Sequence, residues 1–207
     1  MSQPLRICGL GVGAGEALGA TVRAASGRDS TGSRNSNTYP SGVDITQDGH
    51  YAIFGDTSPF TVVEVSDISS GKLKPTVVYR LGNELSSSNI LLSPDETLLY
   101  ISNNQSGTIT AAFFDKSTGK LSKGCVSRFL KGFVTHWSYT ASLALEETTG
   151  TGGVVYVAEY GAPSSIGEIN VKSASGKCTL TESSKSPVSD PNSPGLLSIG
   201  AFPPRPF

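Results

Sequence analysis

Short apolar runs separated by turn residues cover most of this chain. The clearest stretch has apolar runs at 89–92, 98–103 and 108–115, with a Ser-Pro-Asp turn at 93–95 and a Ser-Gly turn at 106–107. Pro fits the first central position of a type I turn, and Gly accepts positive φ without steric cost. Because each run is too short for a helix and is rich in β-branched or aromatic residues, the pattern predicts a meander of antiparallel strands.

The same unit recurs along the chain. The start of its second predicted strand and its later Gly-Lys turn keep a nearly constant separation of 20, 21 and 22 residues. These landmarks are Tyr51 and Gly71, Leu98 and Gly119, and Val154 and Gly176. A repeat of about 40–50 residues that carries several strands is the signature of a β-propeller blade, whose twisted sheet buries both faces only by stacking on its neighbours.

We therefore predict an all-β fold, a partial β-propeller at 39–207 built from four-stranded antiparallel meanders. Blades are expected at about 39–88, 89–141 and 142–194, followed by one terminal strand at 195–202. This makes an incomplete arc, because closed propellers have about four to eight blades. Such an arc leaves an apolar sheet face bare at each end, so we expect the missing blades of a longer protein, or another chain, to close the ring.

Residues 1–38 do not share this pattern. The Gly-rich stretch at 9–15 resembles a phosphate-binding loop, but it lacks the preceding strand and the βαβ context of that motif. Arg6 and the mildly apolar residues after it make a weak match to a secretory signal, since Glu16 follows quickly. We interpret 1–38 as an irregular or flexible leader, or as the remnant of another blade.

Charge and hydropathy exclude two classes of partner. The formal net charge is −1, so we expect no nucleic-acid partner. No apolar run approaches the roughly 20 residues that span a bilayer, so we expect no membrane partner either. The abundance of Ser, Thr, Gly and Asn slightly favours an extracytoplasmic or secreted protein, and a cytoplasmic location stays open.

The chain has three cysteines, so at least one of them is unpaired within the chain. Cys125 and Cys178 lie near the predicted fourth strands of adjacent blades, and they form either a disulfide or two separate half-buried thiols. No Cys-x-x-Cys or His-Cys cluster in the sequence indicates a zinc site. Asn104-Gln105-Ser106 is a glycosylation sequon, which matters only if the protein is secreted.

Several blade motifs give the chain a resemblance to a known family. The Ser-Pro-Asp turn at 93–95, the Leu-Tyr-Ile-Ser-Asn strand at 99–103, the Phe-Asp-x-x-Thr-Gly-x-Leu ending at 114–121 and the strand at 155–160 resemble the blades of the lactonase family of seven-bladed propellers. That family includes propeller-type 6-phosphogluconolactonases and carboxymuconate-lactonizing enzymes. The resemblance covers about 40–202 and implies the C-terminal portion of such a propeller.

The resemblance implies hydrolysis or reversible closure of a sugar or muconate lactone at the mouth of the propeller channel. The chain alone, as a truncated arc, is expected to be inactive. Propellers that only bind or scaffold share the same Ser-Pro-Asp and Tyr-Val-x-Asn motifs. A non-catalytic binding or scaffold protein is therefore the alternative function.

One end of the blades is the predicted site. In a four-stranded meander, the start of the first strand and the connection from the second to the third strand lie at the same end, and polar side chains converging there form the default binding site. For a small-molecule lactone or sugar-like ligand, the candidate substrate-binding residues are Asn103, Asn104, Trp137, Tyr139 and Tyr160. Trp137 provides either packing between blades or a flat platform for a sugar-like ring.

His136 and Glu159 are the candidate catalytic residues. His136 has the intrinsic pKa of a general base, and a solvent-exposed histidine in a crossing loop is the plain alternative. Asp56, Asn103 and Glu159 share the same offset of 5 residues from the start of their second strands. They are either hard oxygen ligands for a divalent cation, as in propeller lactonases of other families, or a repeated device that ends a strand.

Overall fold

The computed structural model is built from β-strands alone in the part of the chain that it describes. It describes residues 40–56, 62–70, 74–80, 87–103, 106–128, 130–131, 139–149, 152–160 and 164–190. No helix in these segments is long and apolar enough to cross a membrane. The strands are β1 (Pro40–Ile45), β2 (Tyr51–Asp56), β3 (Val62–Asp67), β4 (Lys74–Arg80), β5 (Ser87–Leu92), β6 (Leu98–Asn103), β7 (Thr108–Asp115), β8 (Lys120–Val126), β9 (Tyr139–Thr149), β10 (Gly152–Tyr160), β11 (Ser164–Ala174), β12 (Lys177–Glu182) and β13 (Val188–Asp190).

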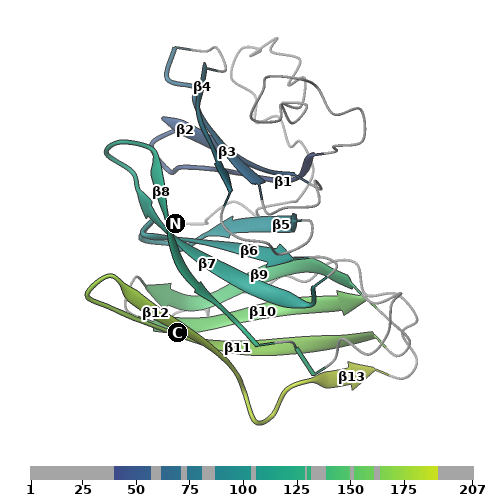
Figure 1. The fold of residues 1–207 in the computed structure, drawn as a ribbon. Helices are drawn as coiled ribbons and strands as arrows, with labels where there is room; N and C mark the ends of the chain where they lie inside the picture. The colour runs from purple at the N-terminus through teal and green to yellow at the C-terminus, as the bar shows by residue number, and fades with distance from the viewer. Residues whose placement is uncertain are drawn as a thin grey trace, which may run out of the picture.

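These strands form three antiparallel sheets, each a run of consecutive strands. The first sheet has the order β1-β2-β3-β4 and the second has the order β5-β6-β7-β8. The third runs β9-β10-β11-β12, and β13 pairs with β11. Figure 1 shows the three sheets stacked one on the next, with the second between the other two. The predicted partial propeller of meandering blades is thereby confirmed.

The first strands of the sheets form the inner side of the arc. β1 contacts β5, and β5 contacts β9, while the outer strands β8 and β12 also meet. Gly42 brings β1 close to β5, because a Cβ at this position would lie 3.0 Å from the backbone nitrogen of Ile90 and 3.1 Å from Cα of Asn89. The described sheets do not close into a ring, as the arc prediction requires. The predicted leader at 1–38 and the predicted strand at 195–202 lie outside the described residues, and the blade boundaries remain predictions.

The middle sheet is buried on both faces because side chains alternate along a strand. In β6, Leu99 and Ile101 pack toward the first sheet, while Leu98 and Tyr100 pack toward the third. All four side chains are 0% exposed. The interface between the first and second sheets contains Tyr51, Ile53, Ile90, Leu92, Leu99, Ile101, Ala112, Phe114 and Leu121. The interface between the second and third sheets contains Leu98, Tyr100, Ile109, Ala111, Leu130, Val155, Val157, Ile169, Val171 and Leu180.

The Ser-Pro-Asp turn between β5 and β6 fastens the first two sheets together. Gln47 donates its backbone N–H to the carboxylate of Glu96 and its side-chain amide to the carbonyl of Pro94 at 2.8 Å. Asp44 Oδ2 accepts the backbone N–H of Leu92 at 2.8 Å. The interpretation of this turn as structural fits these contacts, because they lie at the end of the sheet opposite to the connection from β6 to β7.

The third sheet differs from the prediction in its fifth strand. β12 pairs with Ile169–Ala174 of β11, and β13 pairs further along the same edge with Ser164–Ile166. The fourth strand of this blade is therefore interrupted. Ser183 donates its backbone N–H to the carbonyl of Glu168 at 2.8 Å, and the Oγ of Ser186 accepts the N–H of Glu168 at 3.1 Å. These bonds hold the interruption against β11, and the sequence marks it with serines followed by Pro187, which cannot donate to a strand ladder.

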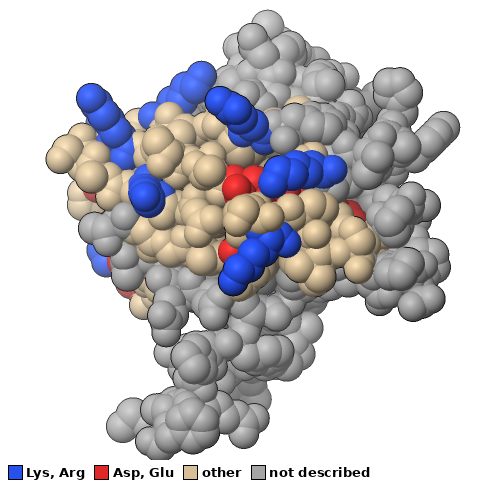
Figure 2. Space-filling view, turned by 90° about the horizontal axis from the view of Figure 1, so that it is seen from below, with Lys and Arg blue, Asp and Glu red and all other residues tan. Residues whose placement is uncertain are grey.

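The outward faces at both ends of the arc carry exposed apolar side chains, because Val188 in β13 of the third sheet is 63% exposed beside Ile166 of β11. On the first sheet, Val43 and Ile45 are 55% and 47% exposed. On the third sheet, β11 and β12 turn polar residues outward, because Glu168 and Lys172 alternate with buried Ile169 and Val171. Figure 2 shows separate Lys and Arg side chains with Asp and Glu between them on the side of the molecule below the third sheet in Figure 1. The outer half of this face is therefore compatible with water.

Replacement of one buried isoleucine tests the stacking of the first two sheets. Ile53 is 0% exposed in the interface, so Ile53→Ala should lower the free energy of unfolding by about 2–5 kcal/mol. The matched control is Ile45→Ala in the neighbouring strand, whose side chain is 47% exposed and should cost under about 1 kcal/mol. Urea denaturation measures both values, and equal losses would contradict the stacking.

Candidate functional site

The connection from the second to the third strand of each blade begins at an equivalent position. Asp56, Asn103 and Glu159 stand opposite Val62, Thr108 and Ser165, respectively, near the start of the third strands. Strand alternation turns Asn103 and Glu159 toward the preceding sheet, since Asn103 follows Ile101 and Glu159 follows Val157 on their faces. Asn103 therefore lies on the first-sheet side of the second sheet, whereas Glu159 lies on the second-sheet side of the third.

The amide of Asn103 is occupied by neighbouring threonines. Asn103 is 0% exposed, and its Nδ2 donates to Thr108 Oγ1 at 3.0 Å and to Thr110 Oγ1 at 2.9 Å. These are cross-strand bonds that hold the end of β6 against β7. The bonds of the Asn103 amide nitrogen are those that the strand-ending device predicts.

Glu159 is a buried carboxyl group near the end of β10. Its side chain is 1% exposed, and the Oγ of Ser165 donates a hydrogen bond to Oε2. Oε1 is buried and has no hydrogen-bond partner among the described residues. Gly167 makes the space for this carboxyl, because a Cβ there would lie 3.0 Å from Oε1 and 2.7 Å from Cγ1 of Val157.

Burial raises the pKa of the Glu159 carboxyl above its usual value. The hydrogen bond from Ser165 acts in the opposite direction and lowers this pKa, while the negative charge of Glu182 adds a smaller increase. A carboxyl group with a raised pKa holds its proton to higher pH and, once ionised, is a stronger base than an exposed carboxylate. Among the candidates with described side chains, Glu159 is therefore the best suited to acid–base chemistry.

The third sheet gathers further candidate residues at the same end. Tyr139 in β9 is paired with Tyr160 in β10, and Thr140 is paired with Glu159. The structure describes only the backbone at Tyr139, Tyr160 and Asp56. His136, Trp137 and Asn104 lie outside the described residues, so their predicted roles stay predictions.

Sequence reasoning missed Ser165 and Gly167, the two neighbours that define the environment of Glu159. A signal was present, since Ser165 lies at the start of the third strand, six residues after Glu159. The burial of the Glu159 and Ser165 side chains depends on the packing of one sheet against another, which the sequence does not show.

The predicted cation ligands do not gather within the described residues. No group of three or more His, Cys, Asp or Glu side chains in that part of the chain could hold a metal ion. Asn103 and Glu159 also face different sheet interfaces. A cation held by Asp56, Asn103 and Glu159 therefore remains a prediction.

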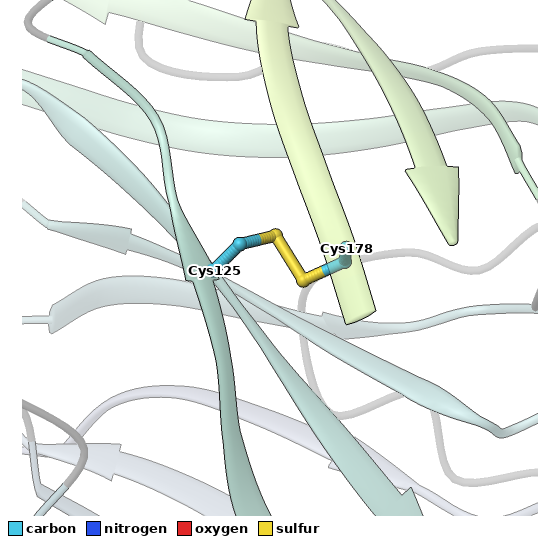
Figure 3. The surroundings of a disulfide bond; sticks show 2 residues. All are labelled: Cys125 and Cys178. Carbon is cyan, nitrogen blue, oxygen red and sulfur yellow. A yellow bond between two sulfur atoms is a disulfide. The ribbon is translucent and has the colours of Figure 1, made fainter. Parts of the chain in front are cut away.

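Cys125 and Cys178 form a disulfide, which decides between the two alternatives that the sequence left open. The bond joins β8 to β12, the outer strands of the second and third sheets, with the two Cα atoms 5.5 Å apart (Figure 3). The alternative of two separate thiols is wrong because the two strands meet at the outer edge of the arc.

Comparisons with known proteins identify the fold. No protein-family model matches the chain, and no curated protein matches it. Among solved structures, a protein from Lactobacillus plantarum superposes with a TM-score of 0.57 at 20% identity over 69% of this chain. A proposed 6-phosphogluconolactonase from Bacteroides fragilis gives 0.55 at 20% identity over 70% of this chain. The periplasmic gluconolactonase of Pseudomonas aeruginosa gives 0.55 at 15% identity over 70% of this chain.

The chain spans 40%, 39% and 40% of the length of these three structures. At such identities the likeness concerns the fold. Within that limit the predicted resemblance is confirmed, because the chain has the fold of part of a β-propeller and superposes on lactonase-like propellers.

The carboxyl group of Glu159 should change how the free energy of unfolding depends on pH. Because its pKa is higher in the folded than in the unfolded chain, its stabilising effect is complete below the unfolded pKa and is lost as the pH rises through the folded value. Glu159→Gln replaces the ionisable carboxyl with an amide that does not titrate. The stability of the variant relative to wild type should therefore rise as the pH increases from 4 to 8.

Denaturant unfolding at both pH values measures the difference. Glu168→Gln, in the adjacent strand of the same sheet, controls for the loss of one negative charge. A difference between Glu159→Gln and wild type that does not change with pH would refute the assignment.

Proposed function

We propose that this chain is part of a lactonase-like propeller that hydrolyses or reversibly closes a sugar or muconate lactone at the Glu159 end of the third sheet. The observation that carries the proposal is the buried Glu159 carboxyl, with one oxygen bonded to Ser165 and the other without a partner among the described residues. The fold shared with a periplasmic gluconolactonase and a proposed 6-phosphogluconolactonase supports the same reaction class.

Glu159 is the general acid–base of the proposed reaction. As a carboxylate it takes a proton from water while the water oxygen attacks the lactone carbonyl, and it then returns the proton to the ring oxygen as the C–O bond breaks. The raised pKa of Glu159 makes its carboxylate a stronger base than an exposed carboxylate, which favours the removal of a proton from water. His136 is the second candidate for this proton transfer.

The remaining candidates bind the substrate. Tyr139 and Tyr160, which are paired at the Glu159 end, contact the lactone ring together with Trp137, Asn103 and Asn104. The oxyanion of the tetrahedral intermediate needs a positive group or hydrogen-bond donors. A divalent cation is one candidate for that role, with Asp56, Asn103 and Glu159 as its proposed ligands. The arc alone is proposed to be inactive, since blades from the rest of a longer protein or from another chain complete the mouth.

A non-catalytic binding or scaffold propeller is the second candidate function. The contacts of Asn103 favour it, because the residue equivalent to Glu159 in the second sheet donates its amide to Thr108 and Thr110 and so holds the sheet together. In that case the same end of the third sheet binds a ligand without converting it.

A lactone panel separates the two functions. The assay uses the longest product of the gene, and genomic sequence upstream of Met1 shows whether further blades are encoded in frame. Loss of the general base should lower kcat by about 10²–10⁴-fold in Glu159→Gln. His136→Ala tests the alternative base, and Glu168→Gln is the control. Activity that survives both Glu159→Gln and His136→Ala would reject the site, and ligand binding without turnover by the wild type would favour the second function.

A further inference from the structure

The outer strand of the second sheet, β8, has one residue more than β7 over the length in which the two strands pair. Along β7 and β8, Ala111 is paired with Cys125 and Ala112 is paired with Lys123. Gly124 is the extra residue between them, so β8 has a β-bulge at this point. A bulge changes the face toward which every later side chain of its strand points.

The bulge determines where Cys125 points. Leu121 stands opposite Phe114 and packs toward the first sheet. Strict alternation would place Cys125 on that same face, opposite Thr110, because the two positions are four residues apart. With Gly124 inserted, Cys125 instead stands opposite Ala111, on the face that packs toward the third sheet. Cys178 packs against the same interface from β12.

The position of the extra residue accepts only glycine. A Cβ at Gly124 would lie 2.4 Å from the carbonyl oxygen of Ala111 and 3.0 Å from Sγ of Cys178. The first distance is a clash with the backbone of the neighbouring strand, and the second is a contact with the disulfide itself. The residue that directs Cys125 is thus also the residue that leaves room for the sulfur of Cys178.

The bond adds a covalent link at the outer edge of the interface between the second and third sheets. The apolar cluster holds the inner part of the second and third sheets together. Nearer the edge, Lys131 donates its backbone N–H to Glu182 Oε2 at 3.0 Å and its Nζ to the carbonyl of Ser183 at 3.3 Å. Both cysteines are half-buried and pack against the apolar cluster of this interface.

We propose that the Cys125–Cys178 bond is a structural link between the second and third sheets, built by the Gly124 bulge, and that the chain completes its fold in an oxidising compartment. Formation transfers two electrons and two protons from the two thiols to an external disulfide, which leaves as two thiols. A small dithiol reverses the reaction and is itself oxidised to a disulfide. Disulfides of this structural kind persist in secreted and periplasmic proteins and are rare in the cytosol.

Thiol counting on the full chain, purified without reductant from an oxidising compartment, is the first measurement. Of the three cysteines, only Cys8 should react with an alkylating reagent after denaturation without reductant, and all three should react after a dithiol is added. Cys8→Ser removes the background reaction. Three reactive thiols without reductant would overturn the proposal.

Stability and the bulge supply the second measurement. Reduction of the folded protein, or the double variant Cys125→Ser/Cys178→Ser, should lower Tm by roughly 5–15 °C. In the reduced protein and in the double variant, hydrogen exchange should become faster in β8 and β12 before it changes in other strands. Deletion of Gly124 should leave Cys125 and Cys178 as free thiols because Cys125 then points toward the first sheet. A Tm unaffected by reduction, or a disulfide that survives the deletion, would contradict the proposal, and the Cys8→Ser protein shows whether scrambling contributes.

Discussion

The stacking of sheets through the two faces of β6 is the constraint on which the rest of the structure depends. All six residues of this strand are buried, and odd and even positions pack on different neighbours. A sheet with two apolar faces cannot stand alone in water, so the second sheet requires both the first and the third. This stacking places the first strands along the inner side of the arc and the outer strands at its edge. It also places the strand ends where the candidate site lies.

The candidate site is a consequence of that packing and not an addition to it. Glu159 continues the face on which Val155 and Val157 pack against the second sheet. A carboxyl group in this position loses its water, and the missing side chain of Gly167 provides the space that it occupies. Burial therefore raises the pKa of Glu159, and the property that suits the residue to proton transfer follows from its place in an apolar interface.

Much of the fold could be predicted because blade repeats depend on local signals. The turns at Ser93–Asp95 and the glycine turns mark the strand ends, and alternation marks the faces. Alternation in the sequence also marks the polar positions of β11, because Glu168 and Lys172 occupy its outward face.

Other features could not be predicted because they depend on contacts between distant residues. The bond between Cys125 and Cys178 requires the register shift at Gly124, which becomes visible only when β7 and β8 are paired. The interruption between β12 and β13 depends on bonds to Glu168 from the adjacent strand. The environment of Glu159 likewise requires Ser165 and Gly167 to be placed beside it by the pairing of β10 with β11.

Native-state hydrogen exchange of the β6 amides tests the central claim most directly. A strand paired on both edges and covered on both faces exchanges only when the whole arc unfolds, so its amides should have the highest protection in the protein. Their exchange free energies should equal the global free energy of unfolding. Exchange of β6 as fast as that of the exposed positions in β1 would mean that the sheets are not stacked in solution, and it would contradict the account.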